Sequence, residues 1–239
     1  MAQRDGAAEG AAQSSAEAAA DAAEYLLYCF AQSGNAYKVA QFLETVSVQR
    51  GRKLWTPRFV DYFHGETHTP EYRAINVMGE VPVLEFDGTR LTQSGAILLK
   101  LAGRLGAFAP ADEAERDEVL RWLLFDNHKF TSYTATYRFL RAFAKAPDPA
   151  VLEFLRTRCE GAWNVLNTHL GGRAFVLGEH ASIADFSLAG YVFFDDEIGV
   201  HWRKEYPHVH AWMERMRAMP GWKHPYDLMP GHPVPKAPQ

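Results

Sequence analysis

The segment from Gly79 to Leu98 carries the residue types of a binding site for a peptide-like anion. Val81-Pro82 stands directly before an apolar strand pattern, and proline is the residue type before which a cis peptide bond costs little. A cis turn would leave the backbone groups of Val81 facing outward, unpaired by the sheet. Ser94 precedes an apolar helix pattern and is a good N-cap, and a helix N-terminus attracts anions. Together, the two features predict a site for an anionic, peptide-like ligand.

The elements that must position these residues alternate between strands and helices in the first part of the chain. Apolar runs and helical spacing predict, in order, a strand at 25–30, a helix at 36–48, an edge strand at 53–61 containing Pro57, a helical turn at 70–75, two strands joined at Asp87-Gly88, and a helix at 94–105. The order β-α-β-α-β-β-α predicts a mixed sheet of four strands.

The remainder of the chain shows only helical patterns. They predict helices at about 112–143, 151–170, 182–194 and 205–219. Ser182-Ile183-Ala184-Asp185 fits a capping box with Asp in the Glu position, and it opens a nearly all-apolar helix that must lie in the core. We therefore expect an α/β unit at 24–105, a linker at 106–111, an all-helical domain at 112–230, and tails at 1–23 and 231–239.

Composition limits the function classes. With a net charge of −4 and an isoelectric point near 6.2, the chain lacks the excess of positive charge that is typical of proteins that bind nucleic acid or an anionic membrane. No apolar run reaches the roughly 18 residues that span a bilayer. Cys29 and Cys159 lie far apart without metal-ligand spacing, which is typical of reduced, buried thiols in a cytoplasmic protein. The ten histidines are scattered, and we expect no metal site. Residues 1–23 lack the features of a signal or presequence, so we expect a disordered or weakly helical tail.

Three motifs resemble those of the cytosolic glutathione transferase superfamily, over nearly all of 25–230. They are Asn76-x-x-Gly79-Glu80-Val81-Pro82-Val83-Leu84, in which Val77 replaces the family's usual proline, then Gln93-Ser94, and Ser182-Ile183-Ala184-Asp185. The resemblance implies a thioredoxin-like N-terminal domain, an all-α C-terminal domain and a homodimer. It also implies glutathione as a co-substrate, with no tightly bound cofactor.

The resemblance assigns most of the glutathione contacts. The backbone of Val81 should pair with the cysteinyl backbone, with Pro82 fixing the geometry in cis. Gln93 and Ser94 should hold the γ-glutamyl end, where hydroxyl, backbone N–H and helix dipole suit a carboxylate. Glu80 belongs to the same binding motif. Either Thr67 or His68 should provide the donor for the glycyl carboxylate.

By resemblance to the serine- and threonine-type members, Ser33 falls where the catalytic hydroxyl sits, and Asn35 where one bacterial class places a second polar group. A free thiol has a pKa near 8.5, and one hydrogen bond to the thiolate, worth about 1.5–3 kcal/mol, would lower it by roughly one to two units. Both residues are equally suited to capping a helix. A tyrosine mechanism is the alternative and would draw on Tyr25, Tyr28 or Tyr37. Because Cys29 lies in the predicted strand, a cysteine-dependent reaction is disfavoured.

Phe130, Tyr133 and Tyr137 share one face of the long helix, and such a stripe belongs to a core more often than to a pocket. Because the polar Asn127, His128, Thr131 and Ser132 lie among them, we expect this face to line a pocket for a hydrophobic, electrophilic second substrate. The expected function is a glutathione transferase that activates the thiolate for attack on that electrophile. A glutathione-dependent disulfide or peroxide reductase is one alternative. A non-catalytic binding or regulatory protein on the same fold is another.

Overall fold

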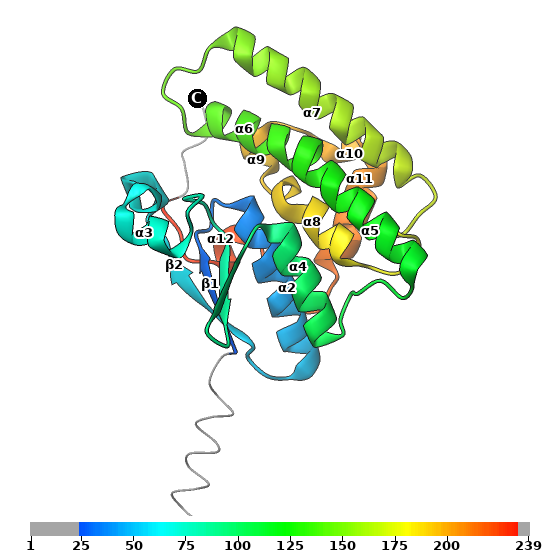
Figure 1. Cartoon of the computed structure of the whole chain (residues 1–239). Helices are drawn as coiled ribbons and strands as arrows, with labels where there is room; N and C mark the ends of the chain where they lie inside the picture. The colour runs from blue at the N-terminus through cyan, green and yellow to red at the C-terminus, as the bar shows by residue number, and fades with distance from the viewer. Residues whose placement is uncertain (1–23, 234–239) are drawn as a thin grey trace, which may run out of the picture.

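The computed structural model describes residues 24–233 and shows a small sheet with its helices joined to a larger group of helices (Figure 1). This is the thioredoxin-like unit followed by an all-helical domain that the sequence predicts. The tail predicted at 1–23, and residues 234–239 of the second predicted tail, lie outside the described residues.

The sheet has four strands in the order β2-β1-β3-β4. Its strands are β1 (Tyr25–Cys29), β2 (Trp55–Phe59), β3 (Val83–Phe86) and β4 (Thr89–Thr92). The β1–β2 pair is parallel, and the other two pairs are antiparallel. The edge position of β2 confirms the prediction from Pro57, which lacks an N–H for a second neighbour.

Two local predictions around β3 and β4 are confirmed. Phe86 stands opposite Thr89, so Asp87 and Gly88 alone make the turn, with φ values of 47° and 70°. Positive φ at both positions is the signature of the type I′ hairpin. The Val81–Pro82 peptide bond is cis.

The sheet unit carries α2 (Gly34–Arg50), α3 (Pro70–Ile75) and α4 (Ser94–Leu105), with short 3₁₀ turns η1 (Tyr62–His64) and η2 (Glu66–His68) between β2 and α3. Alternate residues of β1 face opposite sides of the sheet. Leu27 belongs to the large core with α2 and α4, whereas Tyr28 belongs to a small cluster with Tyr72 of α3.

The helical domain comprises α5 (Glu113–Phe125), a π segment η3 (Asp126–Phe130), α6 (Thr131–Ala142), α7 (Pro149–His169), α8 (Ile183–Val192), α9 (Asp195–Ile198), α10 (Trp202–Glu205), α11 (Pro207–Arg217) and α12 (Pro225–Leu228). The single long helix predicted at 112–143 therefore contains a π segment in its middle. None of the described helices is long and apolar enough to cross a membrane.

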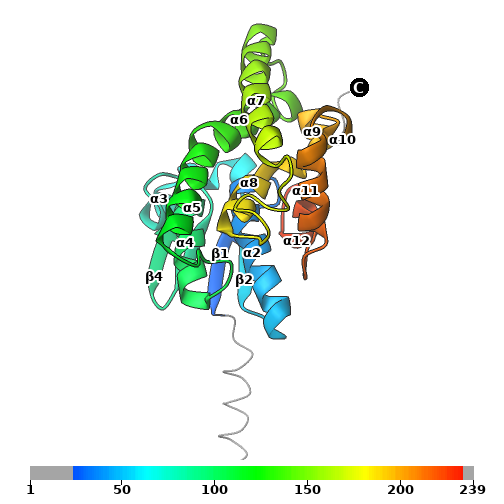
Figure 2. The same ribbon diagram turned by 90° about the vertical axis from the view of Figure 1, so that its right-hand side faces the viewer.

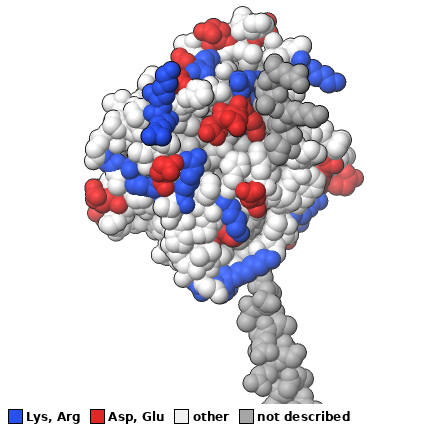
Figure 3. Space-filling view, turned by 180° about the vertical axis from the view of Figure 1, so that it is seen from behind, with Lys and Arg blue, Asp and Glu red and all other residues white. Residues whose placement is uncertain are grey.

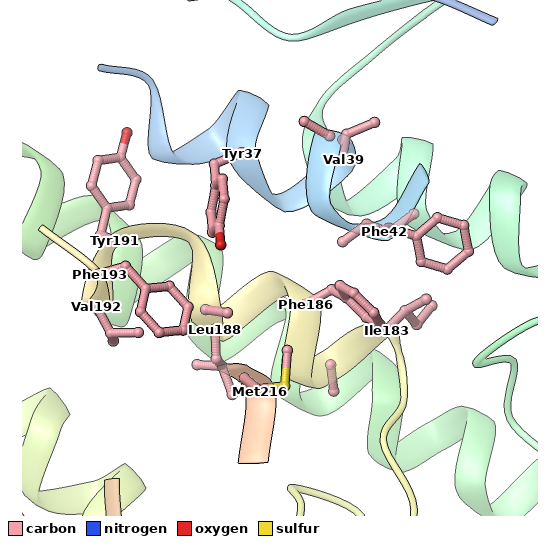
Figure 4. Close-up of a cluster of buried hydrophobic side chains, with 14 of the residues drawn as sticks. Tyr37, Val39, Phe42, Ile183, Phe186, Leu188, Tyr191, Val192, Phe193 and Met216 are labelled. Atoms are coloured by element: carbon pink, nitrogen blue, oxygen red, sulfur yellow. The ribbon is translucent and has the colours of Figure 1, made fainter. Parts of the chain in front are cut away.

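Helix α8 forms the centre of the molecule, surrounded by helices of both units (Figure 2). All of its residues are buried, as its apolar sequence predicts, and its capping box forms with Asp185 accepting from the backbone N–H of Ser182 at 2.8 Å. On one side it meets α2: Phe42 and Phe186 pack with ring centroids 5.3 Å apart (Figure 4). The two units thus share one hydrophobic core.

The last described residues return to the sheet unit. Pro230 accepts from the backbone N–H of Ala31 at 2.8 Å. The Gln32 side chain donates to the His232 carbonyl at 2.8 Å and accepts from its N–H at 3.2 Å. The C-terminal segment 230–232 is therefore bonded to the loop between β1 and α2.

The surface of the face seen from behind mixes basic and acidic side chains, with no broad area of one sign (Figure 3). Among the described residues, several charged side chains form ion pairs, such as Lys223 with Glu44 at 2.7 Å.

Candidate functional site

A small polar pocket lies where the start of α2, the cis turn, the start of α4 and the π segment meet. Eight residues line it: Asn35, Asn76, Glu80, Val81, Pro82, Gln93, Ser94 and Asn127. Six of these are among the site residues predicted from the sequence. The pocket combines backbone groups, amides, a hydroxyl and one carboxylate, which suits a polar ligand with both charges.

Side-chain hydrogen bonds from residues that precede the cis turn hold its backbone in place. The Glu80 carbonyl accepts from the Asn76 amide at 2.8 Å and from the Tyr72 hydroxyl at 2.9 Å. The strand β3 begins only at Val83, so Val81 lies outside the ladder and borders the pocket. An extended, peptide-like ligand can therefore pair with the Val81 backbone.

The start of α4 differs from the prediction for Ser94. Gln93 takes the cap position, and Ser94 is the first helical residue without a capping bond of its own. Gln93 has a φ of 67° and a ψ of 111°, a backbone conformation that costs energy for a residue with a side chain. This conformation places the side chains of Gln93 and Ser94, and the free N–H groups of the first turn of α4, beside the pocket. This arrangement is a ready site for a carboxylate.

Ser33 caps α2, where its Oγ accepts from the backbone N–H of Ala36 at 3.2 Å. It is 7% exposed and does not line the pocket itself, whereas Asn35 does. The capping bond uses a lone pair of the hydroxyl, which keeps its own proton for donation. Capping and donation to a bound thiolate are therefore compatible at this residue.

The three tyrosines of the alternative mechanism are engaged elsewhere. Tyr28 donates to Glu85 at 3.2 Å, Tyr37 donates to the Lys223 carbonyl at 2.9 Å, and the Tyr25 hydroxyl accepts from Arg104 at 3.0 Å. Burial raises the pKa of all three, that of Tyr25 to about 12. None of them lines the pocket.

Cys29 is also unsuited to chemistry. Its side chain is completely buried in the large core, and burial raises its pKa to about 12. The thiolate, which is the reactive form, is therefore not populated at neutral pH. Cys159 is likewise buried and free, in agreement with the prediction of two reduced thiols.

The sequence did not single out three residues around the loop before α2. The Tyr191 ring lies under Gly34, so close that a Cβ there would be 2.6 Å from the ring, and the backbone N–H groups of Gly34 and Asn35 lie beside its hydroxyl. Arg138 donates to the Gln32 carbonyl at 2.7 Å. Asn127 reaches the pocket from the π segment, a feature that is frequent at functional sites. Only Asn127 left a sequence signal, as one of several polar residues among the aromatic residues of the predicted long helix.

A buried ion pair fixes the helical domain against α2. Lys38 Nζ lies 2.7 Å from Asp126 Oδ2 and donates to Thr131 Oγ1 at 2.9 Å. Asp126 also accepts from Thr131 at 2.6 Å and from Ser187 at 2.5 Å. Because Asp126 precedes Asn127, this network sets how the π segment meets the pocket.

The residues predicted for the glycyl carboxylate are not brought to the pocket. Thr67 is completely buried and its Oγ1 has no partner among the described residues, whereas His68 is exposed. Neither of them lines the pocket.

The aromatic stripe predicted for the second substrate also lies elsewhere. Phe130 is completely buried and Tyr137 is 7% exposed. Tyr133 borders a hollow on the side of α7, with Phe154 and Val165. Aromatic residues three and four apart share a helix face, but the spacing does not say which neighbour that face meets. Here the face meets α7 and the core.

Similarity to known proteins shows which protein family the chain belongs to. The family model described as the C-terminal domain of glutathione S-transferase matches residues 149–215. A glutathione S-transferase from Pseudomonas fluorescens is 32% identical and has a TM-score of 0.76, covering 86% of this chain and 100% of that one. The chain therefore belongs to the glutathione S-transferase family.

More distant relatives carry the name URE2. Protein URE2 of Meyerozyma guilliermondii is 23% identical, over 82% of this chain and 77% of its own. The yeast prion protein Ure2p shares the fold, with a TM-score of 0.73 and 23% identity. It has been solved as its nitrogen regulation fragment and in complex with glutathione, which cover 83% of this chain and 94% and 96% of theirs.

Proposed function

We propose that this protein is a glutathione transferase that binds glutathione in the polar pocket and activates its thiolate. The observation that carries the proposal is the meeting of the cis turn and the start of α4 in one pocket. Val81 pairs with the cysteinyl backbone. Gln93, Ser94 and the free N–H groups of α4 hold the γ-glutamyl carboxylate, and Glu80 faces the ammonium group.

We assign thiolate activation to Ser33, assisted by Asn35. A hydrogen bond from the Ser33 hydroxyl stabilises the thiolate by about 1.5–3 kcal/mol. The N-terminus of α2 adds a smaller favourable contribution. No side chain of the described cysteines takes part, since both are buried.

The test of Ser33 uses two substitutions and a control. Ser33→Ala should lower turnover about tenfold or more at neutral pH, because it removes the hydrogen bond. Its pH–rate profile should shift upward by roughly one to two units. Ser33→Thr should retain activity. Thr69→Ala, which removes the side-chain cap of α3, controls for the loss of a helix cap. Full activity of Ser33→Ala would refute the assignment.

The second substrate is assigned to a different aromatic group from the predicted one. Phe63 of η1 and Phe139 of α6 are 39% and 42% exposed, and both pack on Phe143, with ring centroids at 5.2 and 6.0 Å. Arg138 lies 5.3 Å from the Phe143 ring and bonds the Gln32 carbonyl, so this group adjoins the loop that carries Ser33. An aromatic surface here favours a flat, hydrophobic electrophile.

A substitution at Phe139 tests this surface. Phe139→Ala should raise the KM for an aromatic halide several-fold and leave the KM for glutathione unchanged. Val48→Ala, at an apolar residue near the end of α2 that is 50% exposed, serves as the control. An unchanged KM for the halide in Phe139→Ala would place the second substrate elsewhere.

Two other functions remain candidates on the same pocket. A reductase that uses two glutathione molecules is favoured by the small residues Gly34 and Asn35 beside the thiol position. Comparing turnover of a disulfide substrate with that of an aromatic halide separates it from a transferase. A regulatory role is favoured by the likeness to the nitrogen regulation fragment of Ure2p. Glutathione binding by calorimetry without turnover of either substrate would support it.

We also propose a cytoplasmic homodimer that joins through α5 and α7. Leu124, Phe154 and Val165 are 69%, 57% and 48% exposed, and the last two border a hollow of about 550 Å³ between α7 and the segment that runs from the end of α5 into α6. Exposed apolar clusters of this kind mark protein interfaces. Val165→Glu should convert the dimer to a monomer in sedimentation experiments, whereas a monomeric parent protein would refute the proposal.

A further inference from the structure

Three potential metal ligands meet beside the loop that carries Ser33, although the sequence predicts no metal site. They are Asp61, His64 at the end of η1, and His232 of the C-terminal segment, and their ligand atoms all lie within 4.8 Å of one another. Asp61 Oδ1 is 2.7 Å from His64 Nδ1 and 3.6 Å from His232 Nε2. The fold thus joins residues from opposite parts of the chain.

The His232 side chain is largely buried and is held in place by its neighbours. It is only 9% exposed, and its Nε2 has no hydrogen-bond partner among the described residues. Its backbone is bonded twice to the Gln32 side chain, and its ring packs on Phe63 and Phe59 with centroids 4.7 and 5.2 Å away. A buried polar atom without a partner costs free energy, and a ligand bound to His232 Nε2 would remove that cost.

The distances suit a small divalent ion better than they suit a second hydrogen bond. At 3.6 Å, His232 Nε2 is too far from Asp61 to bond it directly. Zn²⁺ binds imidazole nitrogen and carboxylate oxygen at about 2.0–2.2 Å, which puts tetrahedral ligand atoms roughly 3.3–3.6 Å apart. His64 is 78% exposed and therefore free to turn its ring to that spacing.

The donor set also selects the kind of metal. Two imidazoles and one carboxylate are ligands for Zn²⁺ and its neighbours in the first transition row. Mg²⁺ prefers oxygen ligands in an octahedral arrangement and is excluded by the two nitrogens. With three protein ligands, the fourth position is open to water.

We propose that Asp61, His64 and His232 bind one divalent transition-metal ion of the Zn²⁺ type. The bound ion joins the C-terminal segment to the residues that follow β2. Since His232 is bonded to Gln32, the ion also holds the loop directly before Ser33.

The test is a titration of the full chain with Zn²⁺ after removal of metal by a chelator. The parent protein should bind one ion in the micromolar range or tighter. His64→Ala should bind at least about tenfold more weakly, since it removes one of three ligands. His180→Ala, at an exposed histidine outside the cluster, should bind like the parent. Failure of the parent to bind Zn²⁺, or equal binding by His64→Ala, would overturn the proposal.

Co²⁺ offers a second, spectroscopic measurement. It requires no substitution of the buried His232, which could disturb folding. The parent should develop the visible absorption of a four-coordinate Co²⁺ site, and excess Zn²⁺ should abolish it, whereas excess Mg²⁺ should not. The absorption should be lost in His64→Ala, whose side chain is on the surface. Unchanged absorption in that variant would place the metal elsewhere and refute this ligand set.

Discussion

Replacing Lys38 with methionine should destabilise the protein more than any exposed ion-pair substitution. The side chains of Lys38 and Asp126 are 2% and 1% exposed, and their charged atoms lie 2.7 Å apart. Removing one partner leaves the other charge buried and alone, which costs about 3–5 kcal/mol. Thr131 and Ser187 still donate to Asp126, so we expect the lower end, about 3 kcal/mol.

The assay is chemical and thermal unfolding followed by circular dichroism. A loss of about 3 kcal/mol corresponds to a decrease in Tm of roughly 6–12 °C for a protein of this size. The double variant Lys38→Met/Asp126→Asn removes the lone charge and should recover part of that stability. Because Asn127 follows Asp126 and lines the pocket, the KM for glutathione should rise in the single variant.

The matched control is Arg121→Met. Arg121 pairs with Glu118 on the surface, where the two side chains are 57% and 49% exposed, so its loss should change stability by about 0.5 kcal/mol or less. If Lys38→Met costs no more than this control, the buried pair does not stabilise the contact between the two units, and the reasoning fails.

Three further results are expected. Cys29 and Cys159 should not react with a thiol reagent at about pH 8 in the folded protein, because burial raises the pKa of each to about 12; both should react in denaturant, and rapid labelling of the native protein would contradict this. Gly190→Ala should lose about 1–3 kcal/mol in urea unfolding, since its Cβ would lie 2.4 Å from Lys38 Cε; an unchanged midpoint would show that the α2–α8 contact yields easily. Trp212→Phe should lose about 1–3 kcal/mol in the same assay because it removes the 2.9 Å bond to buried Asp185, and a stability equal to the parent's would mean that this bond adds nothing.

Local chemistry made much of the fold predictable. Pro57 identified the edge strand, Asp87-Gly88 the hairpin, Pro82 the cis bond and Ser182 with Asp185 the capping box. Each of these rests on a few adjacent residues whose backbone preferences leave few alternatives. Six of the eight residues around the pocket could be named because their motifs resemble those of the glutathione transferases, not from backbone preferences alone.

The remainder depends on contacts between distant parts of the chain. The helical spacing of Phe130 and Tyr137 is the same whether their face meets a cleft or α7, and the structure buries it. The N-cap of α4 is Gln93 and not the predicted Ser94. The φ of 67° at Gln93 is a conformation that the preferences of a glutamine do not predict. No pattern in the sequence links His232 with Asp61.

The bonds between the C-terminal segment and the β1–α2 loop also set an order of events during synthesis. Gln32 and His232 are separated by 200 positions, which ribosomes translate in roughly 10–40 s. In that interval the sheet unit emerges from the ribosome before α8, the helix that covers α2, has been synthesised. The loop before Ser33, to which we assign thiolate activation, therefore acquires its full set of hydrogen bonds only after almost all of the described chain has been made.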